Sequence, residues 1–371
     1  MKRSPEDRQM RNLMGSLWLL VGLVAIVTGL LISMLFFQRT SSNPAVSESV
    51  APANTIAPDT NFVNLWQAPS DWRMMRLAPD EQKKVLYGKE LITRTAEYLG
   101  PNGSVLPLSN GMNCQNCHLS ASTQPWGNNY AAVQANYPKF RERSGRVENQ
   151  VKRVNDCFQR SLNGQPLDST SRKMQSIPAY IRWLGTDVPI KTIPRGTGIF
   201  KLKSLKRAAA PEDNLLVYTQ KCQSCHQATG EGVLTADGRS YAYPPLWGQH
   251  SYNVGAGLYR ISNLAGYVKY NMPLGTTYER PQLSDEEAWD VAAYINSQPR
   301  PSVDISHDWP NVAGEPFDHP FGPYTDPFSE EQHKYGPYKP IKDWKQTHKK
   351  ENVRPSGIQV TIVTERRQRV G

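Results

Sequence analysis

Two short segments of the chain bring cysteine and histidine together in the same order. Residues 114–118 read Cys-Gln-Asn-Cys-His, and residues 222–226 read Cys-Gln-Ser-Cys-His. A Cys-x-x-Cys-His segment is typical of c-type haem attachment, in which both thiols bond to the porphyrin and the histidine binds the iron. The chain is therefore predicted to carry two covalently bound haem c groups, attached through four cysteines and ligated by two histidines: Cys114, Cys117, Cys222, Cys225, His118 and His226.

Two simpler explanations exist for the paired cysteines. Four thiolates are enough to bind one structural zinc ion. A single Cys-x-x-Cys pair is also typical of thioredoxin-like redox sites. Neither explanation accounts for a histidine directly after both pairs, so haem attachment is favoured.

The second axial position of each iron needs a further ligand, which sets the reduction potential. In the second half of the chain, Met272 stands in the segment Asn-Met-Pro-Leu-Gly, where Pro273 stiffens a loop that can present the thioether. We therefore expect Met272 to bind the second iron. The first half has no such loop. Met174 is an alternative there, although it falls on a helical stripe typical of a core.

The first half also contains Cys157, the cysteine left over after the two haem motifs. A buried inert thiol and a disulfide to another chain are its simplest interpretations. However, Arg153 and Arg160 border the same face of an expected helix, and Arg143 and Arg146 stand just upstream. Guanidinium groups favour the thiolate form of cysteine and bind oxyanions with paired donors, unless they merely form a solvated helix face. Together with a haem, these residues indicate redox chemistry on sulfur anions.

Composition and charge define the class of protein that must position these residues. The chain has 371 residues, of which 38% are hydrophobic, with 29 prolines and 26 glycines. This composition favours a mainly α fold of small helical domains with long loops, whose cores are completed by haem. The net charge of +10 attracts anions. We expect small anionic substrates, acidic redox partners or lipid head groups as partners, and no nucleic acid.

The N-terminal region predicts export from the cytoplasm. Residues 13–37 form an uncharged run long enough to cross a bilayer as a helix, and basic residues precede it. We interpret residues 1–38 as a cytoplasmic N-terminus and a single-pass anchor in the inner membrane. Cleavage near Ala45 or Ala51 is the alternative. Both interpretations place the rest of the chain on the periplasmic or extracytoplasmic side, where c-type haem is attached.

The rest of the chain divides by composition and periodicity. Residues 39–61 read as a flexible tether, 62–185 as a first cytochrome c domain, 186–210 as a linker, 211–300 as a second cytochrome c domain, and 301–371 as an extended arm rich in proline and aromatic residues. Helices are expected at 79–99 with Asp80 as cap, at 146–162, at 171–184, in a short segment after Pro211, and at 284–297 with a Ser284–Glu287 capping box. Residues 358–363 favour a strand.

Beyond these features, the sequence resembles the dihaem thiosulfate dehydrogenases. The resemblance rests on both haem motifs, on the segment Arg-Val-Asn-Asp-Cys-Phe-Gln-Arg-Ser-Leu-Asn-Gly at 153–164, and on Asn-Met-Pro-Leu-Gly at 271–275. It covers about residues 62–300, and the segment around Cys157 is its most specific part. Members of this family couple two thiosulfates into tetrathionate or run the reverse reaction, and pass electrons to or from another cytochrome.

The resemblance implies roles for particular residues. Cys157 would be the sixth ligand of the first haem and would also bind substrate sulfur covalently, while Arg143 and Arg153 would bind the substrate. Met272 would complete the second haem. Some members have a lysine directly before this methionine that can replace it as ligand; here Asn271 occupies the position, and Lys269 is a weaker substitute. The competing functions are a non-catalytic dihaem electron carrier, with Met174 on the first haem, and a haem-based sensor.

Overall fold

The computed structural model describes residues 14, 18, 20–24, 26–29, 64–212 and 215–348. The chain forms two compact units, residues 1–57 and 58–371. In the first unit, all described residues are helical and exposed. No helix in the described part of the chain is long and apolar enough to span a membrane. Most of the expected anchor at 13–37, all of the tether at 39–61, and the strand expected at 358–363 lie outside the described residues.

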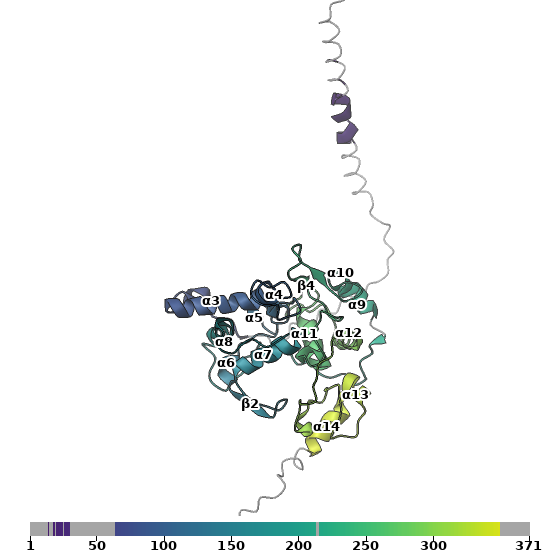
Figure 1. The fold of residues 1–371 in the computed structure, drawn as a ribbon. Helices are drawn as coiled ribbons and strands as arrows, with labels where there is room; N and C mark the ends of the chain where they lie inside the picture. Colours follow the sequence, from purple (N-terminus) through teal and green to yellow (C-terminus); the bar gives the residue numbers. More distant parts are fainter. Residues whose placement is uncertain are drawn as a thin grey trace, which may run out of the picture. The chain divides into compact units, whose positions relative to one another are not determined.

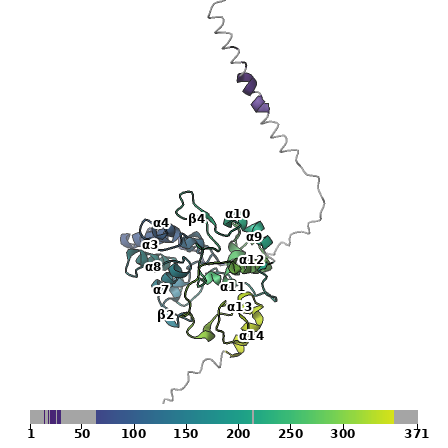
Figure 2. The ribbon, with the colours of Figure 1, turned by 45° about the vertical axis from the view of Figure 1, so that its right-hand side comes forward.

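The second unit is mainly helical and contains two hydrophobic cores, one for each haem motif. The first core is built on two helices, α3 (Pro79–Thr93) and α8 (Arg172–Leu184), which lie side by side in both views (Figures 1 and 2). Gly88 allows this close packing, because a Cβ atom there would lie 2.1 Å from the carbonyl oxygen of Ser176. Shorter elements surround this pair: α2 (Asp71–Met74), α4 (Thr95–Leu99), η2 (Cys114–Asn116), α5 (Leu119–Ser122), α6 (Val133–Asn136), β1 (Lys139–Arg141), β2 (Arg146–Glu148) and α7 (Gln150–Arg160).

The helix expected at 79–99 is interrupted. It divides at Arg94, whose φ of −126° lies outside the helical region, into α3 and α4. The expected cap at Asp80 is also wrong. Ala78 occupies the N-cap and Pro79 the first turn, where the missing N–H of proline costs nothing. Asp80 instead contributes a negative charge to the first turn.

The helix expected at 146–162 begins four residues later than its periodicity suggests. Residues 146–148 form β2, which pairs antiparallel with β1 in a short hairpin that places Arg146 opposite Arg141. Asn149 then caps α7 by accepting a hydrogen bond from the N–H of Lys152 at 2.9 Å. Arg146 is therefore exposed on a hairpin and does not belong to the Cys157 helix.

The helix expected at 171–184 is confirmed as α8, with Ser171 as its N-cap. The stripe of Met174, Ile177, Ile181 and Leu184 is buried, as expected. Pro178 lies inside the helix without ending it. The apolar stripe that packs against α3 thus outweighs the loss of one backbone hydrogen bond.

The second core is built on α11 (Ile261–Asn271) and α12 (Asp285–Ser297), which pack together. The expected capping box is present: Ser284 Oγ accepts from the N–H of Glu287 at 3.0 Å, and Glu287 accepts from the N–H of Ser284 at 2.7 Å. The short helix expected after Pro211 appears as α9. The smaller elements of this half are α9 (Leu215–Lys221), α10 (Gln223–His226), β3 (Val233–Leu234), β4 (Tyr241–Tyr243) and η4 (Gly257–Tyr259).

The linker at 186–210 is packed onto the second core. A Cβ atom at Gly266 of α11 would lie 1.9 Å from the carbonyl oxygen of Phe200, so the glycine lets the linker lie directly on the helix. The indole N–H of Trp289 donates to the carbonyl oxygen of Lys203 at 2.9 Å, and Lys201 donates to Asn263. These contacts join the linker to both helices of the second core.

The C-terminal arm is described as far as residue 348 and contains η5 (Val312–Gly314), α13 (Glu330–Tyr335) and α14 (Tyr338–His348). It is therefore partly helical and not wholly extended. Tyr338 and Ile341 are part of the second core. Asp318 accepts from Arg260 Nε at 2.9 Å, while Asp308 contacts arginines of the first half. Figures 1 and 2 show α13 and α14 together at the end of the described chain.

Candidate functional site

The first haem motif is fixed to the start of α4. Asn113 and Asn116 form a reciprocal cap around η2, in which Asn116 accepts from the N–H of Asn113 at 2.7 Å. The side chain of Asn113 also accepts from the N–H of Ala96 at 2.8 Å. The N–H of Cys114 donates to Thr95 Oγ1 at 2.9 Å. These bonds hold the motif rigidly where a thiol must meet a porphyrin edge.

Both motif histidines are oriented in the same way. His118 Nδ1 is hydrogen-bonded to the carbonyl oxygen of Asn128, and His226 Nδ1 to that of Pro244 at 2.8 Å. Burial lowers the pKa of His118 to about 4 and also lowers the pKa of His226. A neutral imidazole that donates from Nδ1 to a carbonyl presents Nε2 as a metal ligand. The two histidines are therefore prepared to bind iron.

The first motif opens on a cavity of about 130 Å³. Cys114, His118 and Cys157 line this cavity, and Arg153 reaches it from α7. Much of the remaining wall is apolar: Ile92, Val133, Val154, Phe158, Ile177 and Ile181. The donors and the apolar wall fit one haem edge with its axial ligands.

The second motif opens on a larger cavity of about 480 Å³. It is lined by Cys222, Cys225, His226 and Met272, so the expected sixth ligand shares a cavity with the proximal histidine. Lys221 is the only charged residue among the described lining residues. The cavity also reaches Cys117 of the first motif. The donor set and the predominantly apolar wall fit a second haem, and the two sites adjoin.

The two halves are joined directly at these sites. The hydroxyl of Tyr267 on α11 donates to the carbonyl oxygen of Asn116 at 2.9 Å. Asn271, directly before Met272, accepts from Gln124 at 2.8 Å and donates to the carbonyl oxygen of Trp126 at 3.2 Å. The loop that carries Met272 is thus fixed by residues that follow the first haem motif.

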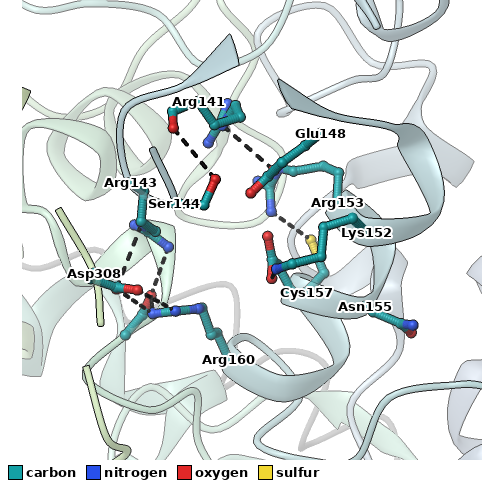
Figure 3. Close-up of polar contacts among 12 residues, drawn as sticks. Arg141, Arg143, Ser144, Glu148, Lys152, Arg153, Asn155, Cys157, Arg160 and Asp308 are labelled. Atoms are coloured by element: carbon teal, nitrogen blue, oxygen red, sulfur yellow. Dashed lines mark hydrogen bonds and ion pairs between the residues drawn. The ribbon is translucent and has the colours of Figure 1, made fainter. Parts of the chain in front are cut away.

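Cys157 lies beside one arginine of the expected set. Arg153 Nη1 is 3.3 Å from Cys157 Sγ, and Figure 3 shows the guanidinium directed at the sulfur. The two residues are one helical turn apart on α7, which brings their side chains together. The pKa of Arg153 is raised above its ordinary value, mainly by the neighbouring Cys157, whereas burial acts in the opposite direction. Arg153 is thus placed to donate to the sulfur of Cys157.

Arg143 lies in the turn of the β1–β2 hairpin; it is not among the residues that line the Cys157 cavity, and it lines a separate hollow with Trp309. It donates from Nη1 to the carbonyl oxygen of Gly255 at 3.1 Å, and its Nε lies 3.9 Å from Asp308 Oδ2. Nε is buried and has no hydrogen-bond partner within the described residues. Burial, and to a lesser extent the charge of Arg160, lowers the pKa of Arg143 to about 10. The guanidinium group is therefore still cationic at neutral pH. It can therefore donate to an anion.

Other residues of the sequence-based hypothesis lie elsewhere. Arg160 donates from Nη1 and Nη2 to the two carboxylate oxygens of Asp308, at 2.7 Å each, instead of facing Cys157. Met174 is fully buried in the first core. Lys269 is also buried, where it forms an ion pair with Asp285 at 3.0 Å and donates to the carbonyl oxygen of Leu283. These three side chains are thus engaged away from the haem cavities.

Sequence reasoning missed two residues of the first site. The ring of Tyr130 lies 4.4 Å from the ring of His118 and lines the same cavity. Asp308 comes from the C-terminal arm and forms ion pairs with Arg143 of the hairpin and Arg160 of α7. Neither residue carries a motif or a periodic pattern, so the chain offers no local signal for either.

Two family models match the chain. The model of the SoxA/TsdA cytochrome c domain matches residues 107–190, and the cytochrome c model matches residues 216–299. Each match contains one Cys-x-x-Cys-His motif, and the first also contains Cys157. The expectation of two cytochrome c domains, each with a covalently bound haem c, is thereby confirmed.

Similar proteins agree with these matches. A thiosulfate dehydrogenase of Allochromatium vinosum is 38% identical over 218 residues, which span 57% of this chain and 79% of that protein. One of Psychrobacter arcticus is 39% identical over 210 residues, spanning 55% of this chain and 61% of that protein. The solved structure of thiosulfate dehydrogenase (TsdBA) from Marichromatium purpuratum in its "as isolated" form has a TM-score of 0.58 and 29% identity, and the match covers 65% of this chain and 51% of that chain. This chain belongs to the dihaem thiosulfate dehydrogenase family.

Proposed function

We propose that this protein joins two thiosulfate ions into tetrathionate, or catalyses the reverse reaction, at the cavity that contains Cys157. The observation that carries this proposal is the position of the sulfur. Cys157 lines one cavity with His118, and its Sγ lies 3.3 Å from a guanidinium nitrogen of Arg153. A cysteine sulfur, a guanidinium group and a haem-binding histidine thus meet in one place.

The reaction balances through a covalent intermediate on Cys157. The thiolate sulfur bonds to the outer sulfur of one thiosulfate, and two electrons leave. The outer sulfur of a second thiosulfate then attacks the outer sulfur of the bound one and displaces the Cys157 thiolate, so that tetrathionate is released. Covalent capture divides a two-electron coupling into simpler steps.

The two haem groups would accept the electrons that leave the substrate. Haem c supplies one-electron redox capacity when bound, and the residues that would hold it in the first site are Cys114, Cys117 and His118, with Cys157 proposed as the sixth ligand. In the second site they are Cys222, Cys225, His226 and the proposed ligand Met272. An external cytochrome is the proposed partner that takes or supplies the electrons.

The arginines counter the repulsion between the substrates. Two dianions about 5 Å apart repel each other by about 3 kcal/mol even with the dielectric constant of water, and by more in a partly buried site. Arg153 is directed at the sulfur, while Arg143 has a buried Nε without a partner among the described residues. Guanidinium donors suit the oxygens of a sulfonate group. We therefore assign substrate binding to Arg143 and Arg153.

The competing function, a non-catalytic electron carrier, is less well supported. It requires Met174 on the first haem and a spectator role for Cys157. Met174 is fully buried in the packing of α8, whereas Cys157 lines the cavity. The geometry therefore favours the enzyme.

The cellular location is part of the same proposal. The uncharged run at 13–37 and the basic residues before it favour a single-pass membrane anchor, with the haem domains on the periplasmic side. The covalent haem motifs are consistent with that location.

Replacing Cys157 by alanine tests the function. We expect thiosulfate-dependent reduction of an external acceptor, and tetrathionate formation, to fall by about a thousandfold or more, because the nucleophile is lost. Haem content is measured in the same preparations. Gln159→Ala, an exposed position on the same helix, is the matched control and should retain activity. An inactive wild-type protein with both haems attached, or a fully active Cys157→Ala variant, would refute the proposal.

A further inference from the structure

The C-terminal arm lies beyond the two matched cytochrome domains, yet its Asp308 forms an ion pair with Arg160 of α7, the helix that carries Cys157. We propose that Asp308 of this arm is a positioning residue, which holds Arg143 in the orientation that binds the anionic substrate. The inference deepens the proposed function and rests on it.

The contacts of Asp308 join two elements of the first domain. Its carboxylate accepts two hydrogen bonds of 2.7 Å from Arg160 on α7, and its Oδ2 lies 3.9 Å from Nε of Arg143 on the hairpin. Figure 3 shows the two arginine side chains converging on this one carboxylate. Asp308 and Arg160 are both largely buried, with 11% and 17% of their side chains exposed. The pair is thus well protected from solvent screening.

The two arginines need such a counter-ion. Arg143 and Arg160 both donate to the carbonyl oxygen of Gly255, at 3.1 Å and 3.4 Å, so their guanidinium groups meet at a single acceptor. Like charges this close repel strongly in a partly buried site. Burial and then the charge of Arg160 lower the pKa of Arg143, while the carboxylate of Asp308 opposes them. Without Asp308, Arg143 would be pushed away from its present position.

The residue after Asp308 strengthens this arrangement. The N–H of Trp309 donates to the carbonyl oxygen of Arg143 at 2.7 Å, and the guanidinium carbon of Arg143 lies 5.8 Å from the centre of the indole ring. The arm therefore contacts the backbone of Arg143 through a hydrogen bond. It contacts the guanidinium group through the indole ring of Trp309 and the carboxylate of Asp308.

These contacts also divide the tasks of the arginines. Asp308 occupies both terminal nitrogens of Arg160, whereas Nε of Arg143 has no hydrogen-bond partner in the described chain. A distance of 3.9 Å to Asp308 is an ion pair and too long for a hydrogen bond. Arg143 is thus held by the carboxylate, and its Nη2, which makes no hydrogen bond within the described residues, is the donor left for the substrate.

The direction in which thiosulfate affinity changes distinguishes a positioning role of Asp308 from the effect of its charge alone. Removing a negative charge near an anion site strengthens anion binding by itself. Losing the fixed orientation of Arg143 weakens it. Weaker thiosulfate binding after a charge-removing substitution can therefore come only from the lost arrangement of the arginines.

The experiment measures thiosulfate binding to the full-length protein with both haems attached and chemically reduced. Reduced haems accept no electrons from thiosulfate, so calorimetry reports binding without turnover. Asp308→Asn should raise the dissociation constant about tenfold, and Asp308→Glu should restore most of the affinity. Asp304→Asn is the control, because Asp304 is exposed on the same arm and caps only the N–H of Ser306. Its affinity should equal that of the wild type.

A double-mutant cycle with Arg143→Lys identifies the path of the effect. If Asp308 acts through Arg143, Asp308→Asn should weaken binding little further in the Arg143→Lys background. Unchanged or tighter binding by Asp308→Asn, or equal weakening in both backgrounds, would overturn the inference. The proposed function fails separately, when the oxidised wild type forms no tetrathionate. Haem content and melting temperature confirm that each variant is folded.

Discussion

The two haem cavities begin from the same five-residue motif and end in different chemistry. In each, the histidine donates a hydrogen bond to a backbone carbonyl oxygen, which belongs to Asn128 in the first site and to Pro244 in the second. The remaining lining residues, which we call the first wall and the second wall, differ. In the first, the helix α7 supplies Cys157 with a guanidinium nitrogen 3.3 Å from its sulfur. In the second, the loop after α11 supplies Met272 within a predominantly apolar wall.

This difference teaches that the attachment motif determines only where a haem is held. A polarised thiol next to cations can bond to a sulfur anion, whereas a thioether between apolar side chains can only ligate and transfer electrons. We therefore expect substitutions in the first wall to change substrate binding, and substitutions in the second wall to change the reduction potential and the turnover that depends on it, but not substrate binding.

The strongest challenge to this comparison is Arg153→Gln, which removes the guanidinium from the first wall. We expect thiosulfate affinity to fall about a hundredfold, because a charge-assisted hydrogen-bond donor is lost from a partly buried site. Arg146→Gln is the matched control, since Arg146 is exposed on the hairpin, and it should have little effect. Equal losses in both variants would show that general positive charge, and not a placed donor, binds the substrate.

Met272→Leu tests the second wall. Loss of the thioether should lower the reduction potential of one haem and reduce turnover about tenfold, while thiosulfate binding to the reduced protein stays unchanged. Redox titration and calorimetry measure the two effects. Met174→Leu is the control, because Met174 is a buried core residue whose replacement conserves volume. A potential shift in this control would reassign the axial ligands.

The smallest expected effects concern a feature that occurs in each half, a serine that caps the N-terminus of a core helix. Ser171 caps α8 and Ser284 caps α12, each through a hydrogen bond to a backbone N–H of the first turn. Ser171→Ala and Ser284→Ala should each lower the free energy of unfolding by about 1 kcal/mol and leave substrate affinity and potentials unchanged. Thermal unfolding measures the loss. A change of thiosulfate affinity in either variant would mean that the scaffold and the walls are not separable.

Local patterns were sufficient for the parts of the fold that repeat or alternate. The haem motifs, the apolar stripe of α8 and the capping box of α12 are all carried by neighbouring residues, and the structure confirms these two helices. The Asn-Met-Pro segment and the position of Arg153 were also visible, because spacing along one helix already places Arg153 beside the thiol.

The remaining features depend on contacts that are distant in the sequence. The helix α11 was missed because ten of its eleven residues are buried, so it has no polar face to make a stripe. The start of α7 was misplaced because residues 146–148 pair with residues 139–141, which overrides their helical period. Asp308 was missed because 148 positions separate it from its partner Arg160. The pattern of the arm by itself predicts neither its particular contacts nor its two helices.

The junction at Asn271 has a consequence for how such a protein can be divided. Gln124 and the carbonyl oxygen of Trp126, both from the first half, bind the side chain directly before Met272. A fragment cut at the linker would lose these partners and expose the face of α11 that now contacts Asn116. The second cytochrome is therefore not an interchangeable module. We expect the reduction potential of its haem to change when the first half is removed.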